Sequence, residues 1–192
     1  MKVIAFNGSP NKDGNTSHLI RHVLSELKKE GIETELIQIG GKTVSPCTAC
    51  FKCFDNQDER CIQENDLVNE CIEKMAGADA IIIGSPTYFA SVTPEIKAFM
   101  DRAFFVAMAN NALFRHKLGA AVIAVRRAGA VTAFDTINHY FGISGMYTAG
   151  SSYWNLGMGL KPGEVENDEA GIETMKQLGQ NIAFFVKKVS KK

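Results

Sequence analysis

The chain has 192 residues, of which 45% are hydrophobic and 22% are charged, and its 21 lysines and arginines balance its 21 aspartates and glutamates. This composition is that of a globular protein and excludes disordered, collagen-like and coiled-coil classes. The absence of net charge leaves no overall field that attracts nucleic acid or an anionic membrane surface, so we expect neither as a partner. The length suits one domain over residues 1–192.

The first half of the chain begins with a strand pattern and an amphipathic helix pattern. Residues 2–6 are a short apolar run that predicts a buried strand, and they are too few for a signal sequence or a membrane span, so we expect a cytoplasmic protein. Apolar residues recur at helical spacing from Thr16 to Leu27 and predict a helix. Residues 33–39 alternate polar and apolar side chains, which predicts a strand with one exposed face or edge, and a cysteine-rich loop at 42–65 follows.

The second half continues the alternation of helices and strands. Two of its apolar runs, 80–84 and 118–125, are continuous, as in strands buried on both faces. Helices are predicted at 66–75, from Pro94 onward, at 131–141 and at 172–189. A weak strand is predicted at 146–149, and a polar loop at 161–169 connects to the last helix. Five strands that alternate with helices predict an α/β, doubly wound parallel sheet with helices on both faces.

The loop after the first strand is dense in glycine, hydroxyl and amide groups, and it leads into the N-terminus of a helix. Free backbone N–H groups and the helix dipole favour an anion there, and nearby side chains add donors: Ser9, Asn11, Asn15, Thr16 and Ser17. The alternative is an ordinary turn in which Thr16 or Ser17 caps the helix. The chain has neither a Walker P-loop nor a Rossmann glycine pattern, so a mononucleotide phosphate fits better than a triphosphate or a dinucleotide.

Four cysteines crowd into the loop at 42–65, namely Cys47, Cys50, Cys53 and Cys61, with two residues between successive members of the first three. In a cytoplasmic chain such crowding indicates metal or redox chemistry rather than structural disulfides. The short intervals suit a [4Fe–4S] cluster. Tetrahedral Zn²⁺ and a set of free or redox-active thiols remain open. Cys71 lies on the apolar face of a predicted helix, which indicates core packing.

Four features in matching order resemble a known family. They are Gly8-Ser9-Pro10 with Gly14-Asn15-Thr16-Ser17, the cysteine cluster, the run from Gly84 to Phe89, and the run from Pro94 to Arg102. Together they resemble the flavodoxin-like NADPH-dependent FMN reductases and, more closely, the iron-sulfur flavoproteins. The resemblance implies a flavodoxin-like, five-stranded parallel sheet of order 2-1-3-4-5 and a bound FMN.

The resemblance also assigns roles to two further loops. In the family, the loop after the third strand holds the isoalloxazine ring, which here places Pro86, Thr87, Tyr88 and Phe89 against it. The alternative for Tyr88 and Phe89 is core packing. The next loop, Arg126 to Ala130, departs from the more glycine-rich family pattern, and we assign Arg127 and Gly129 to the cofactor site. Two roles are open to either Arg126 or Arg127, to balance the charge of an anionic reduced flavin or to bind a phosphate of NADPH, and the alternative is a solvated pair.

The function implied by the resemblance is that of an FMN-dependent oxidoreductase or electron-transfer flavoprotein. It would take electrons from NAD(P)H or a ferredoxin-type donor and pass them to a small molecule or protein carrier, with a [4Fe–4S] cluster as one route. No catalytic side chain is predicted because the flavin performs the chemistry. The alternative is a non-enzymatic electron carrier or redox sensor. The family resemblance implies a homodimer or homotetramer.

Two remaining patterns are given ordinary structural roles. His18 and His22 have the spacing of a metal pair on a helix, but no carboxylate partner is visible in the sequence, so we expect surface residues. Met100 and Met108, with nearby phenylalanines, are expected to fill the core or a subunit interface.

Overall fold

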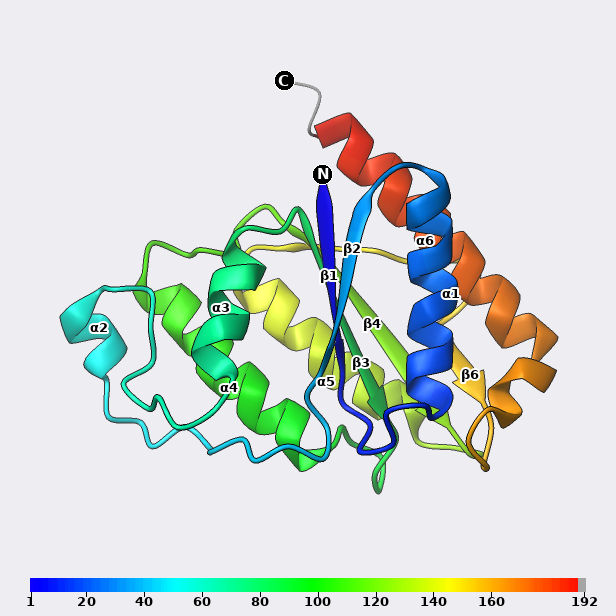
Figure 1. The fold of residues 1–192 in the computed structure, drawn as a ribbon, viewed down its shortest axis with the longest axis horizontal. Helices are drawn as coiled ribbons and strands as arrows, with labels where there is room; N and C mark the ends of the chain where they lie inside the picture. The colour runs from blue at the N-terminus through cyan, green and yellow to red at the C-terminus, as the bar shows by residue number, and fades with distance from the viewer. Residues whose placement is uncertain (190–192) are drawn as a thin grey trace.

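The computed structural model describes residues 1–189, which fold around one parallel sheet (Figure 1). Hydrogen bonding gives the order β2-β1-β3-β4-β5, with the short strand β6 also paired to β4. This order confirms the flavodoxin-like prediction. The strand bounds are β1 Lys2–Asn7, β2 Glu33–Gln38, β3 Ala80–Pro86, β4 Leu118–Val125, β5 Tyr147–Thr148 and β6 Leu156–Met158.

The fifth position of the sheet is filled by two short strands instead of one. β5 pairs with the beginning of β4, at Leu118 and Gly119, and β6 pairs with its end, from Ile123 to Val125. The expected strand at 146–149 therefore contains only two paired residues, and the chain leaves the sheet before it returns as β6. This return brings the segment after β6 to the carboxyl edge of the sheet.

Helices cover both faces of the sheet. α1 and α6 pack together on one face, and α3, α4 and α5 cover the other (Figure 1). The helix bounds are α1 Asn15–Lys29, α2 Lys52–Asn56, α3 Val68–Ala76, α4 Pro94–Ala109, α5 Ala130–Ile143 and α6 Glu169–Val189, with a 3-10 helix η1 at Glu164–Asn167. α2 and η1 fall inside segments that we expected to be loops.

The core explains why the central strands are apolar without interruption. Ile81 and Ile83 of β3 face the helices α3 to α5, whereas Ala80 and Ile82 face α1 and α6. Because both faces of such a strand are buried, its positions are apolar except near its end, where the buried Ser85 accepts the Thr93 N–H. Among the described residues, no helix has the length and apolar character that crossing a membrane requires. The last three residues of the predicted domain, 190–192, lie outside the described part of the chain.

Candidate functional site

The carboxyl ends of β1, β3 and β4 meet at one edge of the sheet, where folds of this kind bind their ligands. The loop from Gly8 to Gly14, which we call the phosphate loop, starts there. Gly8 donates its backbone N–H to the Gly84 carbonyl oxygen over 2.8 Å, and Thr93 donates its hydroxyl to the Gly8 carbonyl oxygen over 2.9 Å. The loop is thus fixed to β3 and to the start of α4.

Polar side chains fix the next residues of the phosphate loop. Ser9 donates its backbone N–H to Asn7 Oδ1 at 3.0 Å, and Asn11 donates its own to Ser9 Oγ at 3.2 Å. Gln38, at the end of β2, donates to the Ser9 carbonyl oxygen at 2.6 Å. A Cβ at Gly40 would lie 2.3 Å from the carbonyl oxygen of Gly8, so only glycine lets the two turns approach this closely. The loop is therefore held in a defined shape by this chain's own groups.

The N-terminus of α1 carries unused hydrogen-bonding capacity. Gly14 precedes the helix and offers no side-chain cap, so the N–H groups of the first turn have no acceptor within the helix. The Ser17 hydroxyl donates to the Gly14 carbonyl oxygen at 2.9 Å. The Thr16 hydroxyl is buried and, among the described residues, has no hydrogen-bond partner. A buried polar group without a partner is costly, and an anion bound at the helix N-terminus would satisfy it.

A cleft at this edge brings together residues of five segments, from the phosphate loop to the segment after β6. Seven of the predicted cofactor residues line it: Ser9, Asn11, Asn15, Thr16, Pro86, Thr87 and Tyr88. Four other predicted residues are not in the lining, namely Ser17, Phe89, Arg127 and Gly129. Gly159 and Leu160 also line the cleft and were not predicted from the sequence, and of the two adjacent arginines it is Arg126 that lines it.

The loop after β3 forms a tight turn over the cleft. Tyr88 and Ser91 exchange both backbone hydrogen bonds, at 2.8 and 2.9 Å, and the two residues between them have positive φ angles, 45° at Phe89 and 60° at Ala90. Such angles are unfavourable for residues other than glycine and tend to occur at functional sites. The Phe89 side chain is fully exposed, at 107% of its reference area, so core packing does not explain it.

The loop after β4 supports this turn. A Cβ at Gly129 would lie 3.1 Å from the Cα of Ala90 and 3.3 Å from the Thr87 side chain, and Gly129 has a φ of 86°. Gly129 therefore allows the two loops to pack together without itself lining the cleft. Arg126 and Arg127 are both exposed, and only Arg126 lines the cleft.

The segment after β6 closes the cleft beside α1. Gly159 donates its N–H to the Val125 carbonyl oxygen at 2.9 Å, and Val165 donates its own to Asn15 Oδ1 at 3.2 Å. The expectation that His18 and His22 lack a carboxylate partner is wrong, because Glu166 lies 2.7 Å from His18 Nδ1 and 2.9 Å from His22 Nε2. Hydrogen bonds from these two rings lower the pKa of Glu166.

The four cysteines of the loop at 42–65 line one hollow between the loop and α4, together with Arg102 and Phe105. Cys47 and Cys50 are exposed, whereas Cys53 and Cys61 are buried. The backbone N–H of Lys52 lowers the pKa of the Cys50 thiol, and burial raises that of Cys53. Burial also raises the pKa of Cys71, which lies in the core, to about 12.

All four cysteines line this one hollow, and cysteine thiolates are the ligands that iron-sulfur clusters use. Within residues 1–189, no three metal-ligating side chains converge closely enough to hold a single ion. Figure 1 shows α2 of this loop at the opposite end of the molecule from β6.

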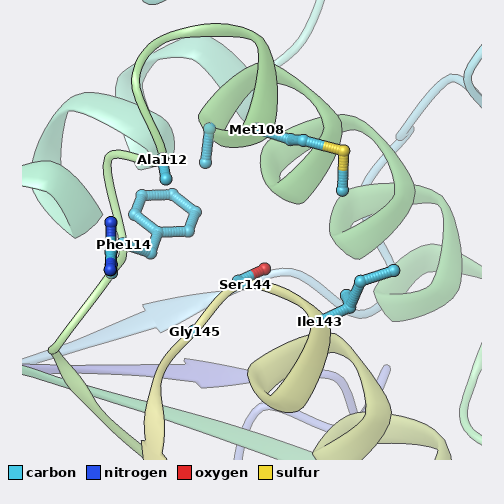
Figure 2. Close-up of a pocket in the computed structure, with 8 residues that line it drawn as sticks. Met108, Ala112, Phe114, Ile143, Ser144 and Gly145 are labelled. Atoms are coloured by element: carbon cyan, nitrogen blue, oxygen red, sulfur yellow. The ribbon is translucent and has the colours of Figure 1, made fainter.

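A further hollow lies at the other edge of the sheet, between the ends of α4 and α5 (Figure 2). Its lining is mostly apolar and includes Met108, Phe114 and Ile143. Met108 and Ile143 are exposed, whereas Phe114 is fully buried. The hollow contains neither the free helix N-terminus nor the backbone turns that make the cleft suitable for a phosphate and a flat ring.

Comparison with known proteins agrees with this geometry. The family model described as NADPH-dependent FMN reductase matches residues 1–161. The chain belongs to this family. An iron-sulfur flavoprotein of Methanocaldococcus jannaschii is 38% identical over the whole of both chains, and one of Methanosarcina thermophila is 31% identical over all of this chain and 98% of its own.

Solved structures show the same fold at low sequence identity. RosB, solved with a bound 8-demethyl-8-formylriboflavin-5'-phosphate intermediate, has a TM-score of 0.75 at 16% identity and covers 100% of this chain and 81% of its own. A flavodoxin from Archaea has a TM-score of 0.63 at 21% identity over 97% and 99% of the two chains. Family membership together with the cleft identifies this chain as an FMN-binding redox protein of the oxidoreductase class.

Proposed function

We propose that this protein is an FMN-dependent oxidoreductase that takes electrons from NAD(P)H or a ferredoxin-type donor and passes them on through a [4Fe–4S] cluster. The observation that carries the flavin site is the buried, partnerless hydroxyl of Thr16 at the uncapped start of α1. The residues fit FMN: the phosphate loop and α1 supply donors for a phosphate, and the turn from Tyr88 to Ser91 supplies a rigid wall for a ring.

FMN, when bound, supplies transfer of two electrons from a nicotinamide or of one electron to or from a carrier. The chain's own residues orient it. The first turn of α1 and Thr16 would bind the phosphate, Asn15 holds the segment after β6 against the cleft, and Thr87 is fixed by its backbone hydrogen bond of 2.9 Å to the Ala124 carbonyl oxygen. Arg126, exposed at the rim of the cleft, would bind the phosphate of an incoming NADPH.

The cysteine hollow supports the cluster in the proposal. Cys47, Cys50, Cys53 and Cys61 would be the ligands, and a cluster bound there supplies one-electron transfer. Relatives of the full chain length carry the name iron-sulfur flavoprotein. Among the alternatives, zinc would require the four thiols to move together around one ion, and free thiols would leave iron and sulfide absent from the purified protein.

The protein's association with itself is part of the proposal. Phe51 and Phe54 pack against Phe105 beside the cysteine hollow and leave 56% and 38% of their own areas exposed. Exposed aromatic groups of this kind are typical of interfaces, so we propose a homodimer or homotetramer. Light scattering coupled to size-exclusion chromatography gives the mass directly. A monomer at micromolar concentration would contradict this part of the proposal.

The function is tested by anaerobic stopped-flow reduction. The protein is purified without oxygen, assayed for iron, sulfide, zinc and FMN, and mixed with NADH, NADPH or reduced ferredoxin while the flavin absorbance is followed. Rapid reduction by a nicotinamide supports the enzyme, and reduction by ferredoxin or dithionite alone supports the carrier or sensor alternative. Arg126→Ala should raise the KM for NADPH with little change for NADH, and Arg127→Ala, outside the cleft, is the matched control.

A further inference from the structure

Arg102, in the middle of α4, is buried completely beneath the cysteine loop. A buried guanidinium is costly unless its charge is paired and its N–H groups have acceptors. The charge is paired, because Asp66 accepts a hydrogen bond from Arg102 Nη1 and its carboxylate side chain is only 2% exposed. The burial of Arg102 is therefore compensated by its ion pair, and its other N–H groups are free to bind neighbouring segments of the chain.

Those donors reach both ends of the cysteine loop. Nη1 also donates to the Ser45 carbonyl oxygen at 3.3 Å, two residues before Cys47, and Nη2 donates to the Gln63 carbonyl oxygen at 2.7 Å. The Nε–H points to Cys61, with a distance of 3.3 Å between Nε and Sγ. One side chain thus fixes the chain before the first cysteine, the chain after the last cysteine and the last cysteine's sulfur.

Cys61 is held from its backbone as well. Asn69 accepts the Cys61 N–H at 2.8 Å through Oδ1 and donates to the Cys61 carbonyl oxygen at 2.8 Å through Nδ2. The two exposed cysteines of the loop, Cys47 and Cys50, have no comparable clamp among the described side-chain hydrogen bonds. Cys61 is therefore held by more side-chain hydrogen bonds than Cys47 and Cys50, and Arg102 is the group that orients its sulfur.

A donor fixed on a ligand sulfur has an effect beyond packing. Hydrogen bonds to the sulfurs of an iron-sulfur cluster stabilise the form that carries more negative charge, which is the reduced form, and so raise the reduction potential. The bond is charge-assisted because its donor is a guanidinium, which makes it stronger than a neutral one. A residue that served only to neutralise Asp66 would not need Nε–H directed at a thiol.

We propose that Arg102 is a positioning residue that holds Cys61 ready as a cluster ligand and, through the Nε–H to Sγ hydrogen bond, raises the reduction potential of the cluster bound there. This inference rests on the proposed [4Fe–4S] cluster. It gives Arg102, at the end of the Pro94 to Arg102 motif, a role at the cysteine hollow, whereas the start of α4 lies beside the phosphate loop, which Thr93 contacts.

The test compares three variants with the wild-type chain, all purified anaerobically in their full length. Arg102→Lys keeps a positive charge for Asp66 but lacks the planar fork that reaches Asp66, Gln63 and Cys61 together. A double variant, Arg102→Met with Asp66→Asn, removes the donor without leaving an unpaired buried charge. Lys97→Met, on the same helix, removes a partly exposed positive charge that pairs with Asp101 and is the control for a general charge effect. FMN content reports whether each variant is folded.

The readouts are iron and sulfide content, the electron paramagnetic resonance spectrum of the reduced cluster and its midpoint potential in a redox titration. We expect both Arg102 variants to retain FMN and to show a lower potential with altered g-values or a loss of iron, while Lys97→Met matches the wild type. Wild-type potential and g-values in either FMN-containing Arg102 variant would overturn the inference. A wild-type chain that binds FMN but no iron and sulfide would refute the cluster itself, which is a distinguishable result.

Discussion

Replacement of Thr16 by valine separates the two roles that the structure gives this position. Valine has nearly the shape of threonine but no hydroxyl, so packing in the core is kept. The Thr16 Oγ1 atom is buried without a partner in the described chain, and we expect it to donate to the phosphate when FMN binds. A hydrogen bond to a charged group contributes about 1.5–3 kcal/mol, so the loss should raise the Kd for FMN roughly 10- to 150-fold.

The same substitution should stabilise the protein when no FMN is bound. An unsatisfied buried hydroxyl costs on the order of 1 kcal/mol, and its removal should raise the melting temperature of the flavin-free chain by about 2–4 °C. Thr34 offers a matched control, because its hydroxyl is also buried without a partner and it lies on β2, paired with Val3 near the opposite edge of the sheet. Thr34→Val should give the same stabilisation with an unchanged Kd.

Both quantities are measured on one preparation. Flavin is removed from each variant, the Kd is obtained from the quenching of FMN fluorescence on titration, and the melting temperature is obtained by calorimetry. If Thr16→Val binds FMN within about twofold of the wild type, the hydroxyl is not a phosphate donor and the placement of the phosphate at the start of α1 is refuted.

Three further predictions follow from the same site and the cysteine loop. Gly129→Ala should destabilise the chain by about 1–2 kcal/mol, because alanine is unfavourable at this φ, and should weaken FMN binding, because the new Cβ would press on Ala90. Gly163 has a similar φ of 79° but open space around it, so Gly163→Ala should lower stability in parallel urea titrations without a change in FMN binding. Glu166→Gln should lower the free energy of unfolding by about 0.5 kcal/mol near neutral pH. Because the two histidines hold the pKa of Glu166 below its ordinary value, this loss of stability is present above about pH 5 and disappears as the pH falls through the lowered pKa. A loss that persists in acid would contradict the assignment. In the cluster-free protein, alkylation at about pH 8 followed by mass spectrometry should modify the exposed Cys50 before the buried Cys71, and modification in the reverse order would refute the assigned pKa directions.

The doubly wound parallel sheet could be predicted from local patterns, whereas its strand order was predicted from the family resemblance. The continuous apolar runs at 80–84 and 118–125 identify strands buried on both faces, and alternation with helices restricts the connections to right-handed crossovers. β6 and α2 could not be predicted in this way, since three and five residues are too few to show a period. Phe51 and Gln57, on either side of α2, have positive φ angles, and neither residue type predicts such an angle.

The parts of the candidate site that depend on the composition of one loop could be predicted from the sequence. The parts that depend on contacts between residues far apart in the chain could not. Hydroxyl and amide groups of the phosphate loop are visible in the sequence. The partner of His18 and His22 is Glu166, more than 140 residues away, and only the return of the chain after β6 brings it to α1. Arg102 likewise has no local signal, because its acceptors lie in and directly after the cysteine loop, 36 to 57 residues earlier in the chain.

The most direct test of the FMN site is a crystal structure of the anaerobically purified protein with FMN. We expect the phosphate at the N-terminus of α1, within hydrogen-bonding distance of Thr16 Oγ1, and the isoalloxazine ring against Thr87 and Tyr88. A flavin bound elsewhere, for example in the apolar hollow between the ends of α4 and α5 (Figure 2), would contradict the assignment of the cleft.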